Sequence, residues 1–431
     1  MIHRFPWLAL VVAAVPGCST GDAARRATAQ IDTLPSGVVQ VMSAEPTSWT
    51  DSSGEWRIEE VQRYGGSDGS PSELADAGSL AVDDLGRLYI ADRKPTIIKV
   101  FDSTGKLVRM IGREGSGPGE FQVAFIAVRG VVLAVHDPQL GRTSVFDTSG
   151  AFIRGWTSSC CFWHEITIDR AGRIYIPTNV RSEKLQRSPA TPYTRYTVDG
   201  KTVDTLLVPV REDGKEWRLS GKGRNGGTIG VVIGVPFSPE TVHAFGRDSG
   251  FVYGWNGEYR FVMSPNGRDT TRLVGRAWVA DPIPEELRLS RVEETVKDAI
   301  EMYDEATLRS MARLADIPTT APAYVSLRVD GDGNVWARRL IGSDSTRTAF
   351  DVFDPTGAWL GPITVRPAVF DGWGHFFGRG VIYTRSEDQD GRPIVVRLRV
   401  SRSRLRRFRF PGHQVARCPM KFWALRVIAV E

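Results

Sequence analysis

The sequence predicts an all-β fold in which six four-stranded sheets form a ring. One pattern recurs six times along the chain: an apolar strand, a turn with glycine, a second apolar strand and then a polar residue. The turn glycines are Gly86, Gly130, Gly172, Gly250, Gly333 and Gly380. Their spacings are 44, 42, 78, 83 and 47 residues, so three intervals equal one unit and two contain inserts. Units of about 40 to 50 residues with four short strands predict the blades of a six-bladed β-propeller.

The first copy, residues 79–121, shows the pattern most clearly. Leu80 and Val82, and then Leu88 and Ile90, alternate with other residues, as in antiparallel strands. Its turns, "DDLG" and "DSTG", combine an aspartate that bonds the backbone ahead of it with a glycine that accepts positive φ. This copy resembles an NHL-type repeat, and residues 56–400 resemble six-bladed bacterial NHL-like propellers. The resemblance implies an architecture rather than an activity, because propellers host many unrelated functions.

The ring is predicted to close through its N-terminal strand. Residues 56–74 read as an outer strand with a glycine-rich exit, and no blade precedes them. The last copy, residues 369–398, stops one strand short. We therefore expect the N-terminal strand to complete the last blade, because this removes two open sheet edges.

The N-terminal 18 residues resemble a secretory signal that ends in a bacterial lipobox. His3 and Arg4 precede an apolar run, and "VPGC" places a small residue before Cys18. We expect export, with a lipid on Cys18 anchoring the protein to the membrane on the periplasmic or outer-membrane side. Ordinary signal cleavage, leaving a soluble exported protein, is the alternative. Residues 19–50 are expected to form a flexible tether, and residues 51–400 the propeller.

The C-terminal end concentrates the positive charge. Residues 397–431 carry +9, whereas the whole chain carries +5, so the remainder carries −4. We expect the basic tail, residues 401–431, to lie outside the ring. It is either structural or artefactual, the latter including a shifted reading frame that replaced the natural end, or it contacts acidic lipid. No nucleic-acid partner is expected for an exported protein.

Two inserts interrupt the repeat. Residues 284–318, between the fourth and fifth blades, carry an apolar stripe that includes Leu289, Val292 and Val296 and predicts a helical hairpin. It either packs on the ring or forms a lid or partner-docking surface. Residues 211–235 are predicted to form a flexible loop. Their glycines lack a strand before and a helix after, so they do not predict a phosphate-binding loop.

Candidate binding residues follow the second strand of each copy, where loops are expected to converge on the channel. They are Asp92, His136, Asp137, Asn179, Trp255, Asn256, Arg338 and Arg385. Carboxylates, an imidazole and amides suit a single divalent cation. The alternative for Asp92 and Asp137 is a structural bond to the backbone of the neighbouring loop.

The motif "SSCCFWHE" holds Cys160, Cys161, His164 and Glu165 at the entry to the third blade. Three interpretations stay open. The adjacent cysteines form a vicinal disulfide in an oxidising compartment, or they act with His164 as a soft metal site, or they pack as partly buried thiols.

These observations predict a binding or scaffolding module at the cell envelope. Its ligand is expected to be an envelope protein, a peptide or a carbohydrate, because tryptophans and arginines lie near the blade ends. The alternative is a divalent-metal-dependent hydrolase or lyase that uses the channel, as in the lactonases and lyases that the ring resembles. The lactonase-type Glu-Gly-Pro opening is absent, and no G-x-S-x-G elbow is present.

Overall fold

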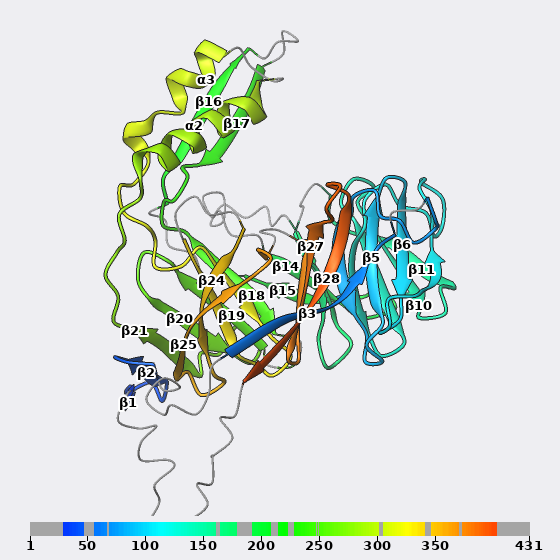
Figure 1. The fold of residues 1–431 in the computed structure, drawn as a ribbon, viewed down its shortest axis with the longest axis horizontal. Coiled ribbons are helices and arrows are strands. Elements are labelled where there is room, and N and C mark those ends of the chain that lie inside the picture. Colours follow the sequence, from blue (N-terminus) through cyan, green and yellow to red (C-terminus); the bar gives the residue numbers. More distant parts are fainter. Residues whose placement is uncertain are drawn as a thin grey trace, which may run out of the picture.

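The computed structural model describes residues 29–46, 56–66, 69–160, 164–178, 192–207, 214–222, 228–246, 248, 250–300, 305–340, 346–369 and 373–402. Six antiparallel blades of four strands follow one another around a ring, and two further strands extend the sheet of the fourth blade (Figure 1). This arrangement confirms the predicted six-bladed β-propeller. The predicted signal segment with Cys18 and the tail beyond residue 402 lie outside the described residues.

The first three blades each consist of four consecutive strands. Blade 1 contains β4 (Ala77–Val82), β5 (Leu88–Arg93), β6 (Thr96–Phe101) and β7 (Leu107–Ile111). Blade 2 contains β8 (Phe125–Arg129), β9 (Val132–Asp137), β10 (Arg142–Asp147) and β11 (Phe152–Thr157). Blade 3 contains β12 (Thr167–Ile168), β13 (Ile174–Pro177), β14 (Tyr193–Tyr196) and β15 (Thr202–Leu206). The first strand of each blade is the innermost.

The last three blades include the closing blade. Blade 4 contains β18 (Thr241–Gly246), β19 (Gly250–Trp255), β20 (Arg260–Ser264) and β21 (Arg272–Arg276). Blade 5 contains β22 (Ser326–Val329), β23 (Val335–Arg339), β24 (Thr348–Phe353) and β25 (Trp359–Val365). Blade 6 contains β26 (His375–Gly378), β27 (Val381–Glu387), β28 (Pro393–Arg402) and β3 (Trp56–Tyr64).

The turns form as the sequence predicts. In the β4–β5 turn, one carboxylate oxygen of Asp83 accepts the backbone N–H groups of Leu85 and Arg87, at 3.0 and 2.9 Å. Gly86 completes the turn at a φ of 76°, where a side chain would be strained. The same bonds recur at Asp169 and Asp330 in blades 3 and 5. A local Asp-x-x-Gly sequence therefore fixes where the innermost strand turns back.

The ring closes through the N-terminal strand, as predicted. Strand β3 pairs antiparallel with β28, from Tyr64 opposite Val395 to Trp56 opposite Arg402. Tyr64 is fully buried and packs edge-on against Phe101 of blade 1. Figure 1 shows β3 beside β27 and β28, next to the start of blade 1.

The prediction of a flexible tether over residues 19–50 is wrong for residues 29–43. They form a hairpin of β1 (Ala29–Thr33) and β2 (Val39–Ser43), and β2 pairs parallel with β21 at the outer edge of blade 4. Val41 is buried there, and Ser43 Oγ accepts the backbone N–H of Trp359. The hairpin forms because it pairs an outer strand that would otherwise expose its edge.

The two inserts form one unit. Helices α2 (Glu285–Ala299) and α3 (Glu305–Met311), followed by a 3-10 turn at Leu314–Asp316, confirm the predicted helical insert between blades 4 and 5. Residues 211–235 were predicted to be a flexible loop. Instead they contain the hairpin of β16 (Glu216–Lys222) and β17 (Thr228–Gly234).

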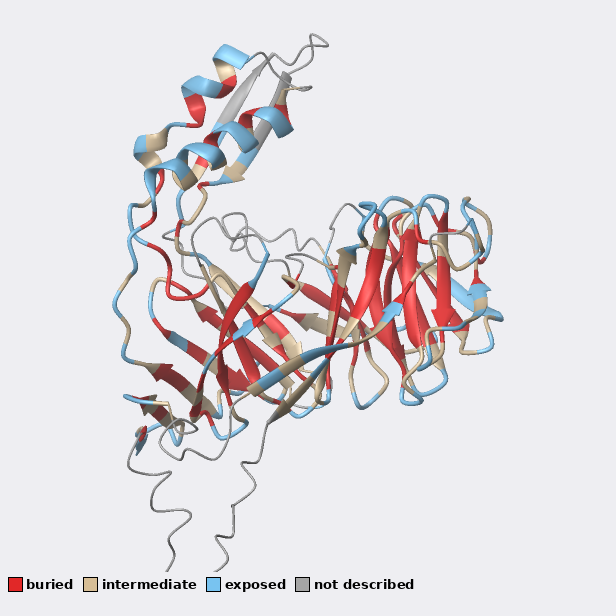
Figure 2. Ribbon diagram, in the orientation of Figure 1, coloured by how far each residue is buried: buried red, intermediate tan, exposed pale blue. Residues whose placement is uncertain are grey.

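The apolar stripe of the helices explains this correction. Val292, Val296 and Leu308 are buried together with Trp217 of β16. The indole Nε1 of Trp217 also donates to Asp316 at 3.0 Å. Each insert joins an outermost strand to the next innermost strand, so both leave the ring on the same face. The resulting unit stands off that face, with the outer surfaces of its helices exposed (Figure 2). Among the described residues, no helix is long and apolar enough to cross a membrane.

Candidate functional site

The innermost strands of all six blades enclose a central cavity of about 420 Å³. Each blade contributes lining residues, and one from each is Ser79, Ala127, Thr167, His243, Arg328 and His375. This volume lies within the range of small-molecule sites in proteins, which are mostly apolar with a few placed polar groups.

Three polar side chains meet in this cavity from three blades. Arg328 of β22 donates its Nε hydrogen to Nε2 of His375 on β26. One carboxylate oxygen of Glu165, just before β12, lies 3.3 Å from the same ring nitrogen. Because Nε2 accepts the guanidinium hydrogen, it carries no proton of its own, so His375 is neutral. The contact between Glu165 and His375 is therefore not an ion pair.

The Glu165 carboxyl sits in an unusual environment. Its side chain keeps 47% of its surface accessible and lines the central cavity. Desolvation by the surrounding protein raises the pKa of Glu165, and the positive charge of Arg328 opposes the shift only in part. Glu165 can consequently hold a proton nearer to neutral pH than an ordinary glutamate.

A second polar group lies on the adjoining wall. His243 Nε2 is 3.2 Å from the hydroxyl of Tyr193. Burial lowers the pKa of His243 to about 4, with smaller contributions in the same direction from His164 and Arg328. Burial also raises the pKa of Tyr193 and lowers that of His164. At neutral pH, Arg328 is thus the fixed positive charge of this set.

Aromatic rings form much of the remaining wall. Trp373 packs edge-on against Phe125, with ring centroids 5.2 Å apart, and Phe245 packs against Tyr193 at 4.8 Å. Trp373, Phe245 and Tyr193 all line the cavity. A ligand with an apolar or aromatic body would contact these rings while its polar end met the cluster.

Three of the residues predicted to bind a ligand instead accept hydrogen bonds from the backbone of a neighbouring loop. Asp92 is fully buried, accepts the backbone N–H of Asp76 at 2.8 Å and pairs with Lys99 at 2.9 Å. Asp137 accepts the N–H of Gln122 at 2.7 Å, and Asn256 accepts that of Glu240 at 2.7 Å. In each case a side chain at the end of the second strand holds the loop that enters the same blade. The structural alternative fits these contacts.

The other predicted residues also lie away from the cavity lining. His136 is fully buried and its Nδ1 contacts Thr143 and Ser158. Trp255 is the last residue of β19, and Arg338 lies on β23. The Arg385 guanidinium lies 3.5 Å from the carboxylate of Asp76. Of the residues predicted to bind a ligand in the channel, none that the structure describes lines the central cavity. Asn179 lies outside the described residues.

Cys160 is disulfide-bonded, and the other three cysteines of the chain lie outside the described residues. The pairing of Cys160 with Cys161 therefore stays a prediction. His164, four residues further on, lines the central cavity. Among the described residues, no three His, Cys, Asp or Glu side chains are grouped closely enough to hold a metal ion.

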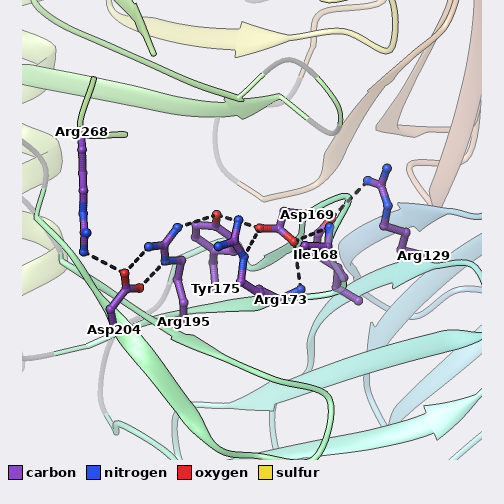
Figure 3. A network of polar contacts seen from close by, with 9 residues as sticks. Arg129, Ile168, Asp169, Arg173, Tyr175, Arg195, Asp204 and Arg268 are labelled. Atoms are coloured by element: carbon purple, nitrogen blue, oxygen red, sulfur yellow. Dashed lines mark hydrogen bonds and ion pairs between the residues drawn. The ribbon is translucent and has the colours of Figure 1, made fainter. Parts of the chain in front are cut away.

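A polar network lies beside the cavity, across blades 2, 3 and 4 (Figure 3). Asp204 of β15 accepts hydrogen bonds from Arg195 of β14 and from Arg268 in the β20–β21 turn. Arg195 also donates to Tyr175, whose hydroxyl donates to Asp169. A second cavity of about 320 Å³ adjoins this network and shares Thr167 and Phe245 with the central one. The guanidinium groups of Arg195 and Arg268 are paired with a carboxylate, so the network is best explained as a clamp between blades.

Sequence reasoning named Glu165 in the SSCCFWHE motif but missed the residues that gather with it in the cavity. The polar residues of the cavity are Glu165, Tyr193, His243, Arg328 and His375. All but Tyr193 lie on, or directly before, the first strand of a blade. Polar residues within the first strand of each copy, rather than after the second, are the signal that would have identified most of them.

Comparisons with known proteins agree with the architecture. The family model DUF5128, described as a 6-bladed beta-propeller, matches residues 73–129, which contain blade 1 and the first strand of blade 2. No curated protein matches the chain.

Solved structures with related shape share little sequence with the chain. A Bacteroides fragilis protein described as exported is 11% identical, with a TM-score of 0.44, over 84% of this chain and 98% of its own. A member of the duf4221 family from Bacteroides vulgatus is 8% identical, with a TM-score of 0.45, over 80% of this chain and 99% of its own. Virginiamycin B lyase from Staphylococcus aureus is 12% identical, with a TM-score of 0.36, over 80% of this chain and 99% of its own.

Proposed function

We propose that this propeller is an exported binding module that holds a small organic ligand in its central channel. The observation that carries the proposal is the meeting of Glu165, Arg328 and His375 from three blades within one cavity. The three residues lie far apart in the sequence, and closure of the ring brings them together. Polar groups in an otherwise largely apolar enclosure are typical of ligand sites.

The lining and the volume of the cavity favour a small molecule as the ligand over the surface of a partner protein. Trp373, Phe245 and Tyr193 offer apolar area for a ligand body, and His243 offers a neutral imidazole. The volume of about 420 Å³ admits a small molecule or the end of a longer one.

The cell envelope is the proposed location. The predicted signal segment ends at Cys18, and a lipid there would tether the ring to a membrane. A Cys18→Ser variant should leave the membrane fraction and appear in the soluble exported fraction. Retention of this variant in the membrane fraction would contradict the lipid anchor without affecting the proposed binding site.

A ligand screen with a channel-filling variant tests the binding role. Thr167 is half-buried, lines the cavity and sits on β12. Compounds that raise the melting temperature of the wild type should lose that effect in Thr167→Phe. Thr202→Phe, at an exposed position on β15 of the same blade, is the matched control and should keep it. Equal responses in both variants would place the binding outside the channel.

A further inference from the structure

The guanidinium of Arg328 differs from those of Arg195 and Arg276, two other arginines that are withdrawn from solvent. Its Nε donates to His375, and its Nη1 donates to the carbonyl of Leu327 at 2.7 Å. No carboxylate in the described part of the chain forms an ion pair with it. Arg195 and Arg276, which are also withdrawn from solvent, are each paired with an aspartate. Among the described residues, Arg328 is thus a cation without an ion-paired carboxylate.

This missing partner matters because of where Arg328 lies. It is half-buried and lines the central cavity. A charge withdrawn from bulk water is costly unless it is paired. A planar guanidinium also favours a planar oxyanion, because two of its N–H groups can bond both oxygens at once.

Glu165 does not fill the position of the counter-ion. Its carboxylate oxygen contacts His375 rather than Arg328. Enclosure raises its pKa, so its negative charge is less firmly held than that of an exposed glutamate. The presence of this carboxyl nearby also favours a ligand with one negative charge over one with two.

We propose that the channel ligand is a small organic acid whose carboxylate binds the guanidinium of Arg328. This inference rests on the proposed binding function and adds the chemical class of the ligand. The carboxylate forms charge-assisted hydrogen bonds to Nη1 and Nη2, while the body of the acid packs on the aromatic wall near Trp373.

Matched acids and amides test this assignment by isothermal titration calorimetry. Three acids are each compared with the corresponding amide: acetate, phenylacetate and 1-naphthylacetate. Phenyl phosphate is included as a ligand with two negative charges. The wild type, Arg328→Gln, Arg328→Lys and the channel-filling Thr167→Phe are titrated after their melting curves confirm folding. Arg339→Gln is the control, because Arg339 lies on the same blade in a partly exposed ion pair with Asp281.

At least one acid should bind the wild type ten times or more tightly than its amide. Arg328→Gln should abolish that preference, Arg328→Lys should retain part of it, and Arg339→Gln should leave it unchanged. A preference that survives in Arg328→Gln, or tighter binding of phenyl phosphate than of the acids, overturns the assignment. If acids and amides bind equally and Thr167→Phe abolishes both, the inference fails and the binding function stands. If no probe binds the wild type, both fail.

Discussion

Arg328 donates a hydrogen bond to Nε2 of His375, joining the innermost strands of blades 5 and 6 within the central cavity. This bond holds His375 neutral and leaves the outer nitrogen Nη2 of the guanidinium available. The position of Arg328 is therefore fixed before any ligand arrives, which reduces the ordering cost of binding.

Replacing Glu165 with glutamine should strengthen the binding of an organic acid. The substitution removes a carboxylate that repels the ligand when it is ionised, by about 1 kcal/mol or more inside the cavity. The gain should be several-fold at pH 8 and smaller at pH 5.5, because the raised pKa of Glu165 lets the wild-type carboxyl take up a proton there. Calorimetry with 1-naphthylacetate measures it, and Glu387→Gln, at an exposed position on β27, is the control. Unchanged affinity at both pH values would show that the Glu165 carboxylate does not act on the bound acid.

The protein should lose stability as the pH falls from 6.5 toward 4. Burial lowers the pKa of His136 to about 4, so the unfolded chain binds a proton before the folded one does. Each such histidine then contributes a slope of about 1.4 kcal/mol per pH unit within that window, and none above it. Urea unfolding at several pH values should show a shallower slope for His136→Asn than for the wild type. Parallel slopes would indicate that His136 is protonated in the fold.

The pair of Arg276 and Asp351 should be a major stabilising contact between blades 4 and 5. Asp351 is fully buried, lies 2.9 Å from Arg276 and also accepts from Tyr259. The Arg276 guanidinium lies between the rings of Tyr259 and Trp359, at 4.2 and 4.5 Å. Arg276→Ala leaves a buried carboxylate without its cation and should cost about 3 to 5 kcal/mol.

The matched control for this pair is an exposed one. Arg379 pairs with Asp332 at 3.0 Å on the surface, so Arg379→Ala should cost less than about 1 kcal/mol. Chemical denaturation of both variants measures the difference. Equal losses would mean that burial does not decide the strength of these pairs.

Closure of the ring should depend on β3. A chain that begins at residue 67 loses the strand that pairs with β28 and leaves the site of Tyr64 empty, at a cost of at least about 3 kcal/mol for that side chain alone. A chain that begins at residue 52 keeps β3 and lacks only the β1–β2 hairpin. Thermal melting should show a much larger loss for the first. Similar melting of the two chains would contradict closure through β3.

Local signals explain how much of the fold was predictable. The Asp-x-x-Gly turns and strand alternation depend on neighbouring residues, so the six blades and the closing strand followed from the sequence. The β1–β2 hairpin and the pairing of β16 with β17 were missed, because they are stabilised by partners far along the chain. Val41 is buried at the outer edge of blade 4, and Trp217 against helices about 80 residues away.

The candidate site was harder to predict for the same reason. Glu165, Arg328 and His375 are separated by more than 150 and by 47 residues, and no local pattern relates them. The residues that were predicted instead, such as Asp92 and Asp137, occupy the same position in successive blades. They do so because each accepts a hydrogen bond from the backbone of the loop that enters its blade. Sequence periodicity identified the repeat, whereas the site consists of residues that break it.

Mass spectrometry of molecules that copurify with the protein tests the central claim most directly. The wild type, Thr167→Phe and Thr202→Phe are expressed through their own export signal, purified under native conditions and extracted for small molecules. We predict one organic acid at close to one per chain in the wild type and in Thr202→Phe, and its absence in Thr167→Phe. Identical extracts from the wild type and Thr167→Phe would contradict the claim that the central channel is a ligand site.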